Sequence, residues 1–152
     1  MTKALTLARP FFVLLILFTV VRLVLSSQGV PYENPRAASI SLVVLTYVCA
    51  AMTAALARGL VGQSLKAAAI MGAQMGFASQ VVIFLVTMVS IAAGAETYFN
   101  YAPAINDALI GKDVTIASAL PYRGVALIIG PITTAIAASI GWLIGGTMGR
   151  RE

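Results

Sequence analysis

Four long runs of apolar residues dominate the sequence and limit the folds that it can adopt. The second run extends from Ala37 to Ala57 without a charged residue. Its length is close to the roughly 20 residues that an α-helix needs to cross the hydrocarbon core of a bilayer. The other runs cover residues 11–25, 67–95 and 124–149. Because the bilayer core has no water to satisfy backbone polar groups, these runs predict membrane-spanning helices.

The composition agrees with a membrane protein. Hydrophobic residues make up 60% of the chain and charged residues 10%, whereas soluble domains contain about a quarter charged residues. We therefore predict an all-α integral membrane protein with one membrane domain, residues 1–152. Four transmembrane helices are expected at about residues 10–27, 37–57, 67–95 and 124–149, arranged as two hairpins in a four-helix bundle. A longer outer loop, residues 96–123, joins the last two helices.

The basic residues fall unequally on the two sides of these predicted helices. Six lie on the side of the termini, namely Lys3, Arg9, Arg58, Lys66, Arg150 and Arg151. Three lie on the other side, namely Arg36, Lys112 and Arg123. Cytoplasmic loops of membrane proteins carry an excess of Lys and Arg. We therefore expect both termini in the cytoplasm and the protein in a plasma or inner membrane.

Small residues repeat every fourth position in the last helix, in the manner of a glycine zipper. They are Thr133, Ala137, Gly141, Gly145 and Gly149. Membrane helices associate where small residues let their backbones approach closely. The third helix has a shorter series, Gly72 and Gly76, whereas the first helix is bulky on every side. The second, third and fourth helices are therefore predicted to form the packed centre, with the first at the rim.

Polar side chains are expected near the middle of three of the helices. This candidate midplane belt consists of Thr46, Tyr47, Gln80, Thr133 and Thr134. An amide without a partner in hydrocarbon costs several kcal/mol, so Gln80 is predicted to hydrogen-bond with these neighbours, a ligand or water. The belt is interpreted either as hydrogen bonds between packed helices or as a site for a small polar molecule.

Charged residues gather near the outer ends of the helices. Arg22 is the only charge inside a predicted helix, and such a residue is a functional hypothesis by default. Pairing with Glu96, or extension of its side chain to the lipid phosphates, would explain it without a function. Arg36, Glu96 and Arg123 are expected on the outer face, where Tyr98, Phe99, Tyr101 and Tyr122 are interpreted as an interfacial aromatic belt.

The residue types exclude most familiar site chemistry. The chain has no His, one Cys and five acidic residues. It therefore offers no catalytic triad, no Cys and His cluster for a metal and no pair of carboxylates at helical spacing. The basic residues form no patch with aromatics that would bind nucleic acid. We expect no enzyme activity, no catalytic residue, no cofactor and no nucleic-acid partner.

Two functions remain open from the sequence. The first is an interaction protein that works as a homo-oligomer or as an accessory or structural subunit of a membrane complex. It depends on Gln74 and Ser139, which place polar groups opposite the glycine series of their helices. The second is a small transporter, channel or lipid- or small-molecule-binding protein that uses the midplane belt. The expected partners are the bilayer and either a second copy or other membrane subunits.

Overall fold

The chain folds entirely into helices joined by short connections. The computed structural model describes residues 2–148, and among these the side chains of residues 6–35, 37 and 39–146. The long helices are α1 (Thr2–Ser27), α3 (Leu42–Val61), α4 (Leu65–Ala92) and α6 (Ile116–Met148). The connections hold α2 (Pro35–Ala38), α5 (Ala102–Ile105) and the 3-10 turn η1 (Asp107–Leu109). Each long helix is long and apolar enough to cross a membrane, which confirms the predicted all-helical fold with four candidate membrane-spanning helices.

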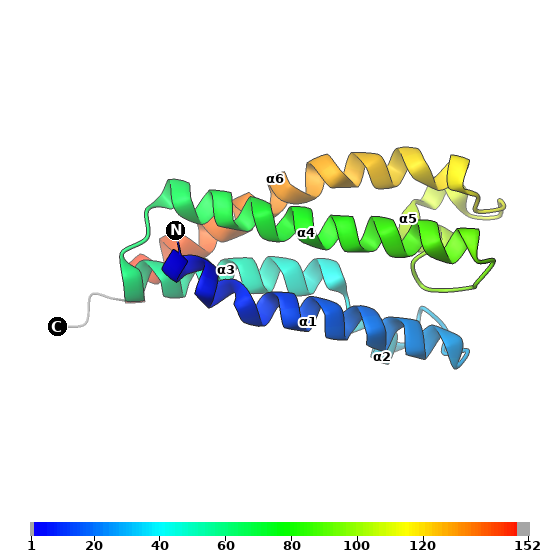
Figure 1. The fold of residues 1–152 in the computed structure, drawn as a ribbon, viewed down its shortest axis with the longest axis horizontal. Coiled ribbons are helices and arrows are strands. Elements are labelled where there is room, and N and C mark those ends of the chain that lie inside the picture. Colours follow the sequence, from blue (N-terminus) through cyan, green and yellow to red (C-terminus); the bar gives the residue numbers. More distant parts are fainter. Residues whose placement is uncertain (1, 149–152) are drawn as a thin grey trace.

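The four long helices lie side by side in an elongated bundle (Figure 1). The start of α1, the turn between α3 and α4, and the end of α6 lie at one end of the bundle, called here the terminal end. The connections formed by residues 28–41 and 93–115 lie at the other end, called here the loop end. This arrangement places two long connections next to each other at the loop end.

The last long helix begins earlier than the sequence predicts, because capping residues and not charged residues set its start. Thr115 and Ser118 exchange hydrogen bonds between side chain and backbone, Ser118 N to Thr115 Oγ1 at 3.2 Å and Thr115 N to Ser118 Oγ at 2.9 Å. This reciprocal cap begins α6 at Ile116. The predicted start at residue 124 is therefore wrong, and the connection before α6 covers residues 93–115 instead of 96–123. As a result, Arg123 lies inside a helix.

The second long helix also differs from the prediction. Residues 37–57 do not form one helix, because Ser41 adopts an extended conformation and caps a new helix that begins at Leu42. The preceding Pro35–Ala38 segment forms the separate short helix α2. Gly62 ends α3 in the left-handed conformation, with φ 61°. Consequently α3 begins further from the loop end than α1 and α4 extend (Figure 1).

α6 makes the most extensive helix contacts, with α4 and α3, whereas α1 packs mainly against α3. Gly141 and Gly145 bring α6 against the backbone of α3. A Cβ at Gly145 would lie 2.5 Å from Ala55 O, and one at Gly141 would overlap Ala51 O. Ala137 is half-buried on the same line of α6, and Gly149 lies outside the described residues. The glycine series therefore contacts a helix of the same chain.

The contact between α4 and α6 uses a second line of small residues on α6. A Cβ at Gly72 would come 2.5 Å from Ala138 Cβ, and one at Gly76 would come 2.6 Å from Thr134 Oγ1. Thr134 and Ala138 are four residues apart, as Gly141 and Gly145 are, so they share one side of the helix. α6 therefore presents one line of small residues to α3 and another to α4.

Large aliphatic side chains cover the outside of the bundle. Val13, Leu60 and Ile128 are each about two-thirds exposed. A surface with this many exposed apolar side chains is typical of helices that face lipid. Gln74 is also exposed on this surface.

Candidate functional site

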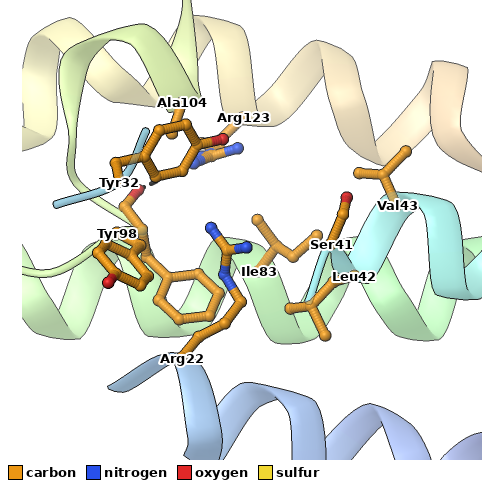
Figure 2. A pocket seen from close by; sticks show the side chains of 10 residues that line it. Arg22, Tyr32, Ser41, Leu42, Val43, Ile83, Tyr98, Ala104 and Arg123 are labelled. Atoms are coloured by element: carbon orange, nitrogen blue, oxygen red, sulfur yellow. Dashed lines mark hydrogen bonds between the residues drawn. The ribbon is translucent and has the colours of Figure 1, made fainter. Parts of the chain in front are cut away.

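A cavity of about 80 Å³ lies at the loop end, beyond the start of α3. Its walls come from every long helix and from both long connections (Figure 2). The lining residues are Arg22, Tyr32, Ser41, Leu42, Val43, Ile83, Tyr98, Phe99, Ala104 and Arg123. The cavity therefore exists because α3 begins late while its neighbours continue.

Arg22 reaches this cavity from α1 and is only 7% exposed. Its Nη1 donates hydrogen bonds to Ile40 O at 2.9 Å and to Ala37 O at 3.4 Å. These carbonyls belong to the non-spanning segment before α3. The expected pairing with Glu96 is wrong, since Glu96 is exposed and Arg22 bonds to backbone. The side chain turns toward these carbonyls inside the protein.

Three aromatic rings surround the Arg22 guanidinium group. Its Cζ lies 5.2 Å from the ring centre of Tyr98, 5.5 Å from that of Tyr32 and 5.7 Å from that of Phe99. At these distances the negative faces of aromatic rings attract a cation. Tyr98 and Phe99 are buried, so they belong to the protein interior and not to an interfacial belt. The rings explain how a cation is accommodated here without an acid.

Arg123 enters the same cavity from α6. Its Nη2 donates a hydrogen bond to Phe99 O at 2.8 Å. Its Nε is buried and has no hydrogen-bond partner among the described residues. In Figure 2 the guanidinium groups of Arg22 and Arg123 point into the space between them, with the Tyr32 ring beside Arg123. The structure thus joins two arginines that are far apart in the sequence.

No acidic residue is found among the described residues that line the cavity. Glu33 lies at the loop end but accepts a hydrogen bond from the Tyr101 hydroxyl. This bond lowers the pKa of Glu33 and raises the pKa of Tyr101. The Arg36 side chain is not among the described parts of the chain. In the described structure, Arg22 and Arg123 therefore face the cavity without a carboxylate partner.

The start of α3 adds to the positive potential of the cavity. Ser41 Oγ accepts a hydrogen bond from Val44 N and caps this helix, and Ser41, Leu42 and Val43 line the cavity. The N-terminal end of a helix carries a partial positive charge and favours anions. Two guanidinium groups and one helix terminus therefore all favour a negatively charged ligand in the cavity.

The midplane polar residues form separate contacts instead of one site. Tyr47 Oη and Thr133 Oγ1 lie 2.9 Å apart and link α3 to α6. Thr46 Oγ1 hydrogen-bonds with Ser79 Oγ at 2.9 Å and links α3 to α4. Thr134 Oγ1 donates to the carbonyl of Gly130 within its own helix at 2.7 Å.

Gln80, the centre of the predicted belt, makes no hydrogen bond with any described residue. Its side chain instead packs against Gly130, where a Cβ would come 2.5 Å from Gln80 Cγ. The predicted bond from Gln80 to the neighbouring threonines is therefore not formed. Two belt contacts, Tyr47 with Thr133 and Thr46 with Ser79, therefore link pairs of helices.

Sequence reasoning selected Arg22 and Arg123 but did not place them together, and it missed Tyr32 as part of a site. The available signal was a sequence of Pro, Tyr and Arg that occurs twice, as Pro31, Tyr32 and Arg36 and as Pro121, Tyr122 and Arg123. No protein-family model, curated protein or solved structure matches this chain. The geometry of the cavity therefore carries the functional argument.

Proposed function

We propose that this integral membrane protein binds an anionic ligand in the cavity between Arg22 and Arg123. One observation carries the proposal: the buried Arg22 and the half-buried Arg123 face the same space, and no carboxylate of the described residues lines it. Removing a cation from water costs several kcal/mol unless an opposite charge or a full set of hydrogen bonds replaces the water. A bound anion would supply that charge.

A structural role for both arginines is the main alternative. Arg22 has such a role, because it donates to two carbonyls outside the long helices. Arg123 is different, because one bond to Phe99 leaves its buried Nε unused. A cation kept in place only for structure would be expected to use its donors. The unused donor of Arg123 therefore favours binding.

The proposed function agrees with one of the two functions inferred from the sequence, but its site is at a different place in the bundle. A lipid- or small-molecule-binding protein was expected to use Gln80 at the midplane, whereas the cavity lies at the loop end. The excess of Lys and Arg on the terminal side supports cytoplasmic termini. With that orientation, in a plasma or inner membrane, the site opens toward the outer leaflet.

The role of homo-oligomer or accessory subunit loses the support of Ser139, which donates a hydrogen bond to Ala135 O of its own helix at 2.8 Å, and now rests on Gln74. Gln74 is exposed on α4, on the surface that large aliphatic side chains cover. A polar side chain in lipid commonly bonds to another helix. Gly141 and Gly145 no longer support this role, since they contact Ala51 and Ala55 of the same chain.

Binding can be tested by thermal unfolding of the purified full chain in a neutral detergent. The probes are inorganic phosphate and phosphatidylglycerol, each compared with chloride or phosphatidylcholine at equal ionic strength. A ligand that binds only the folded state raises the midpoint of unfolding. At least one anionic probe should raise it for the wild type. Arg123→Gln should abolish the effect.

Lys112→Gln is the matched control, because Lys112 is an exposed cation at the same end of the bundle and does not line the cavity. It should respond to the anion like the wild type. The proposal fails if neither probe stabilises the wild type, or if Arg123→Gln and Lys112→Gln respond alike.

A further inference from the structure

We infer that the bound anion is the phosphate of an anionic phospholipid that enters from the bilayer. This inference rests on the proposed function and specifies its ligand. The shared chemistry is a phosphate oxyanion, which a free phosphate or a lipid headgroup could each supply. The walls of the cavity and its opening favour the lipid.

The donors in the cavity suit a phosphate group. Guanidinium groups bind phosphate through pairs of parallel N–H bonds. Arg22 and Arg123 approach from opposite helices, α1 and α6. The Tyr32 hydroxyl has no hydrogen-bond partner among the described residues, and Tyr32 lines the same space. Several oxygens of one phosphate could therefore be bound at once.

The cavity also has aliphatic walls. Leu42 and Val43 lie with Ser41 on the side away from Tyr98, and Ile83 lies beside Arg22 (Figure 2). An ion that arrives from water brings hydration on every side, and contact with an apolar wall removes part of it without replacement. A phospholipid has an apolar part directly beside its phosphate. Cationic groups and aliphatic walls within one cavity therefore match an amphiphile.

The size of the cavity leads to the same ligand. Pockets that enclose a drug-sized ligand measure about 300–1,000 Å³, so a cavity of about 80 Å³ holds part of a headgroup and cannot enclose a whole lipid. The chains of a bound lipid must lie outside. Val43 provides the exit, because it lines the cavity and is also 39% exposed on the bundle surface. Val44 and Val48, which are 58% and 49% exposed, continue this apolar surface along α3.

The test is to count lipids bound to the full chain released from nanodiscs, by native mass spectrometry. The nanodiscs contain phosphatidylcholine with a minority of phosphatidylglycerol. Loss of one hydrogen bond to a charged group changes affinity by about tenfold or more. The ratio of bound phosphatidylglycerol to bound phosphatidylcholine should therefore be about tenfold higher in the wild type than in Arg123→Gln. Arg123→Lys, which keeps the charge without the paired donors, should fall between them.

A second pair of variants tests the route from the bilayer. Val43→Gln makes the exit polar, and Val44→Gln makes the same change beside it but outside the cavity. Val43→Gln should reduce lipid retention more than Val44→Gln while both keep the wild-type midpoint of thermal unfolding without lipid. Soluble glycerol phosphate at millimolar concentration should not displace the lipid.

The lipid inference is overturned if inorganic phosphate stabilises the protein and phosphatidylglycerol is not retained, an outcome in which the proposed anion site still stands. It is also overturned if glycerol phosphate displaces the lipid, or if phosphatidylcholine is retained as well as phosphatidylglycerol. Absence of binding by every anion would instead overturn the proposed function itself.

Discussion

Toward the terminal end, Gly141 and Gly145 hold α6 against the backbone of α3, whereas at the loop end α3 has not yet begun and a cavity occupies its place. The first region is closed by close contact between helices. The second is lined by side chains from six segments that do not fill it. Because α3 begins late, one end of a tightly packed bundle contains a cavity that can serve as a site.

Arginine has a different role in the two regions. At the terminal end, Arg58 stacks on Trp142, with its Cζ 3.7 Å from the ring centre, and donates to the carbonyls of Trp142 and Leu143. Gly146 leaves the space that this guanidinium group occupies. Arg58 therefore fixes the end of α6 to α3. At the loop end, Arg123 keeps an unused donor beside a cavity.

The largest expected effect is on the closed region. Gly141→Ala should lower the free energy of unfolding by about 3 kcal/mol, because the new Cβ overlaps backbone that cannot move aside cheaply. Gly59→Ala is the control: nothing lies within 4 Å of a Cβ there, so the change should be neutral or stabilise by about 0.5 kcal/mol. Unfolding by SDS titration, followed by circular dichroism, measures both. Equal tolerance of the two changes would contradict the close contact between α3 and α6.

The two arginines of the cavity should differ in their effects on stability without ligand. Arg22→Met should destabilise the protein by about 2 kcal/mol, since it removes bonds from a charged donor to two carbonyls. Arg123→Met should cost less, and removal of a poorly paired buried cation can even be stabilising. The same SDS titration in lipid-free detergent compares them. A larger loss for Arg123→Met would mean that Arg123 is mainly structural.

A smaller effect is expected at the junction that closes the terminal end. Trp142 Nε1 donates a hydrogen bond to the carbonyl of Gln63 in the turn between α3 and α4. Trp142→Phe removes this bond and retains a ring under Arg58, so it should cost about 1 kcal/mol. Lipid retention should not change, because the site lies at the other end. A loss of phosphatidylglycerol binding in this variant would show that the two ends are not independent.

The smallest effect concerns the exposed bond between the two long connections. Because the folded-state pKa of Glu33 lies below its ordinary value of 4.5, the bond stabilises the loop end above that pH and is lost as the pH falls through the lowered pKa. The pKa of Tyr101 lies above its ordinary value of 10, so the contribution is also lost as the pH rises through the raised pKa.

Hydrogen exchange of residues 28–34 tests this dependence when the wild type is compared with Tyr101→Phe at each pH. The wild type should be more protected than the variant at neutral pH. The difference should vanish in acid. If the two proteins differ equally at every pH, ionisation of Glu33 does not control the contact.

The sequence predicts the closed region better than the open one. Charge-free runs are enough to locate four helices, and the repeat of Gly141 and Gly145 is enough to predict close packing. Their partner on α3 could not be predicted, because Ala51 and Ala55 are unremarkable in the sequence and only the helix positions select them. The second line of small residues on α6 was missed, since Thr134 was assigned to the midplane belt and Ala138 does not stand out in an apolar run.

The site was predicted less well for two physical reasons. A charged residue was taken to end a helix, whereas Thr115 and Ser118 cap α6 ahead of Arg123 and carry that arginine into the helix. Acids were taken to be the natural partners of Arg22, whereas backbone carbonyls and aromatic rings serve instead. Both outcomes depend on how distant segments meet at the loop end.

The unequal lengths of the helices have a consequence for the membrane itself. At 1.5 Å per residue, α3, with 20 residues, is about 30 Å long, and α4, with 28 residues, is about 42 Å long. A helix of about 30 Å matches the hydrocarbon core, so the hydrophobic mismatch falls on α4, which a bilayer accommodates by helix tilt or by local thickening. The start of α3 would then lie near the headgroups, and so would the cavity beyond it. A lipid could therefore reach Arg22 without leaving its leaflet.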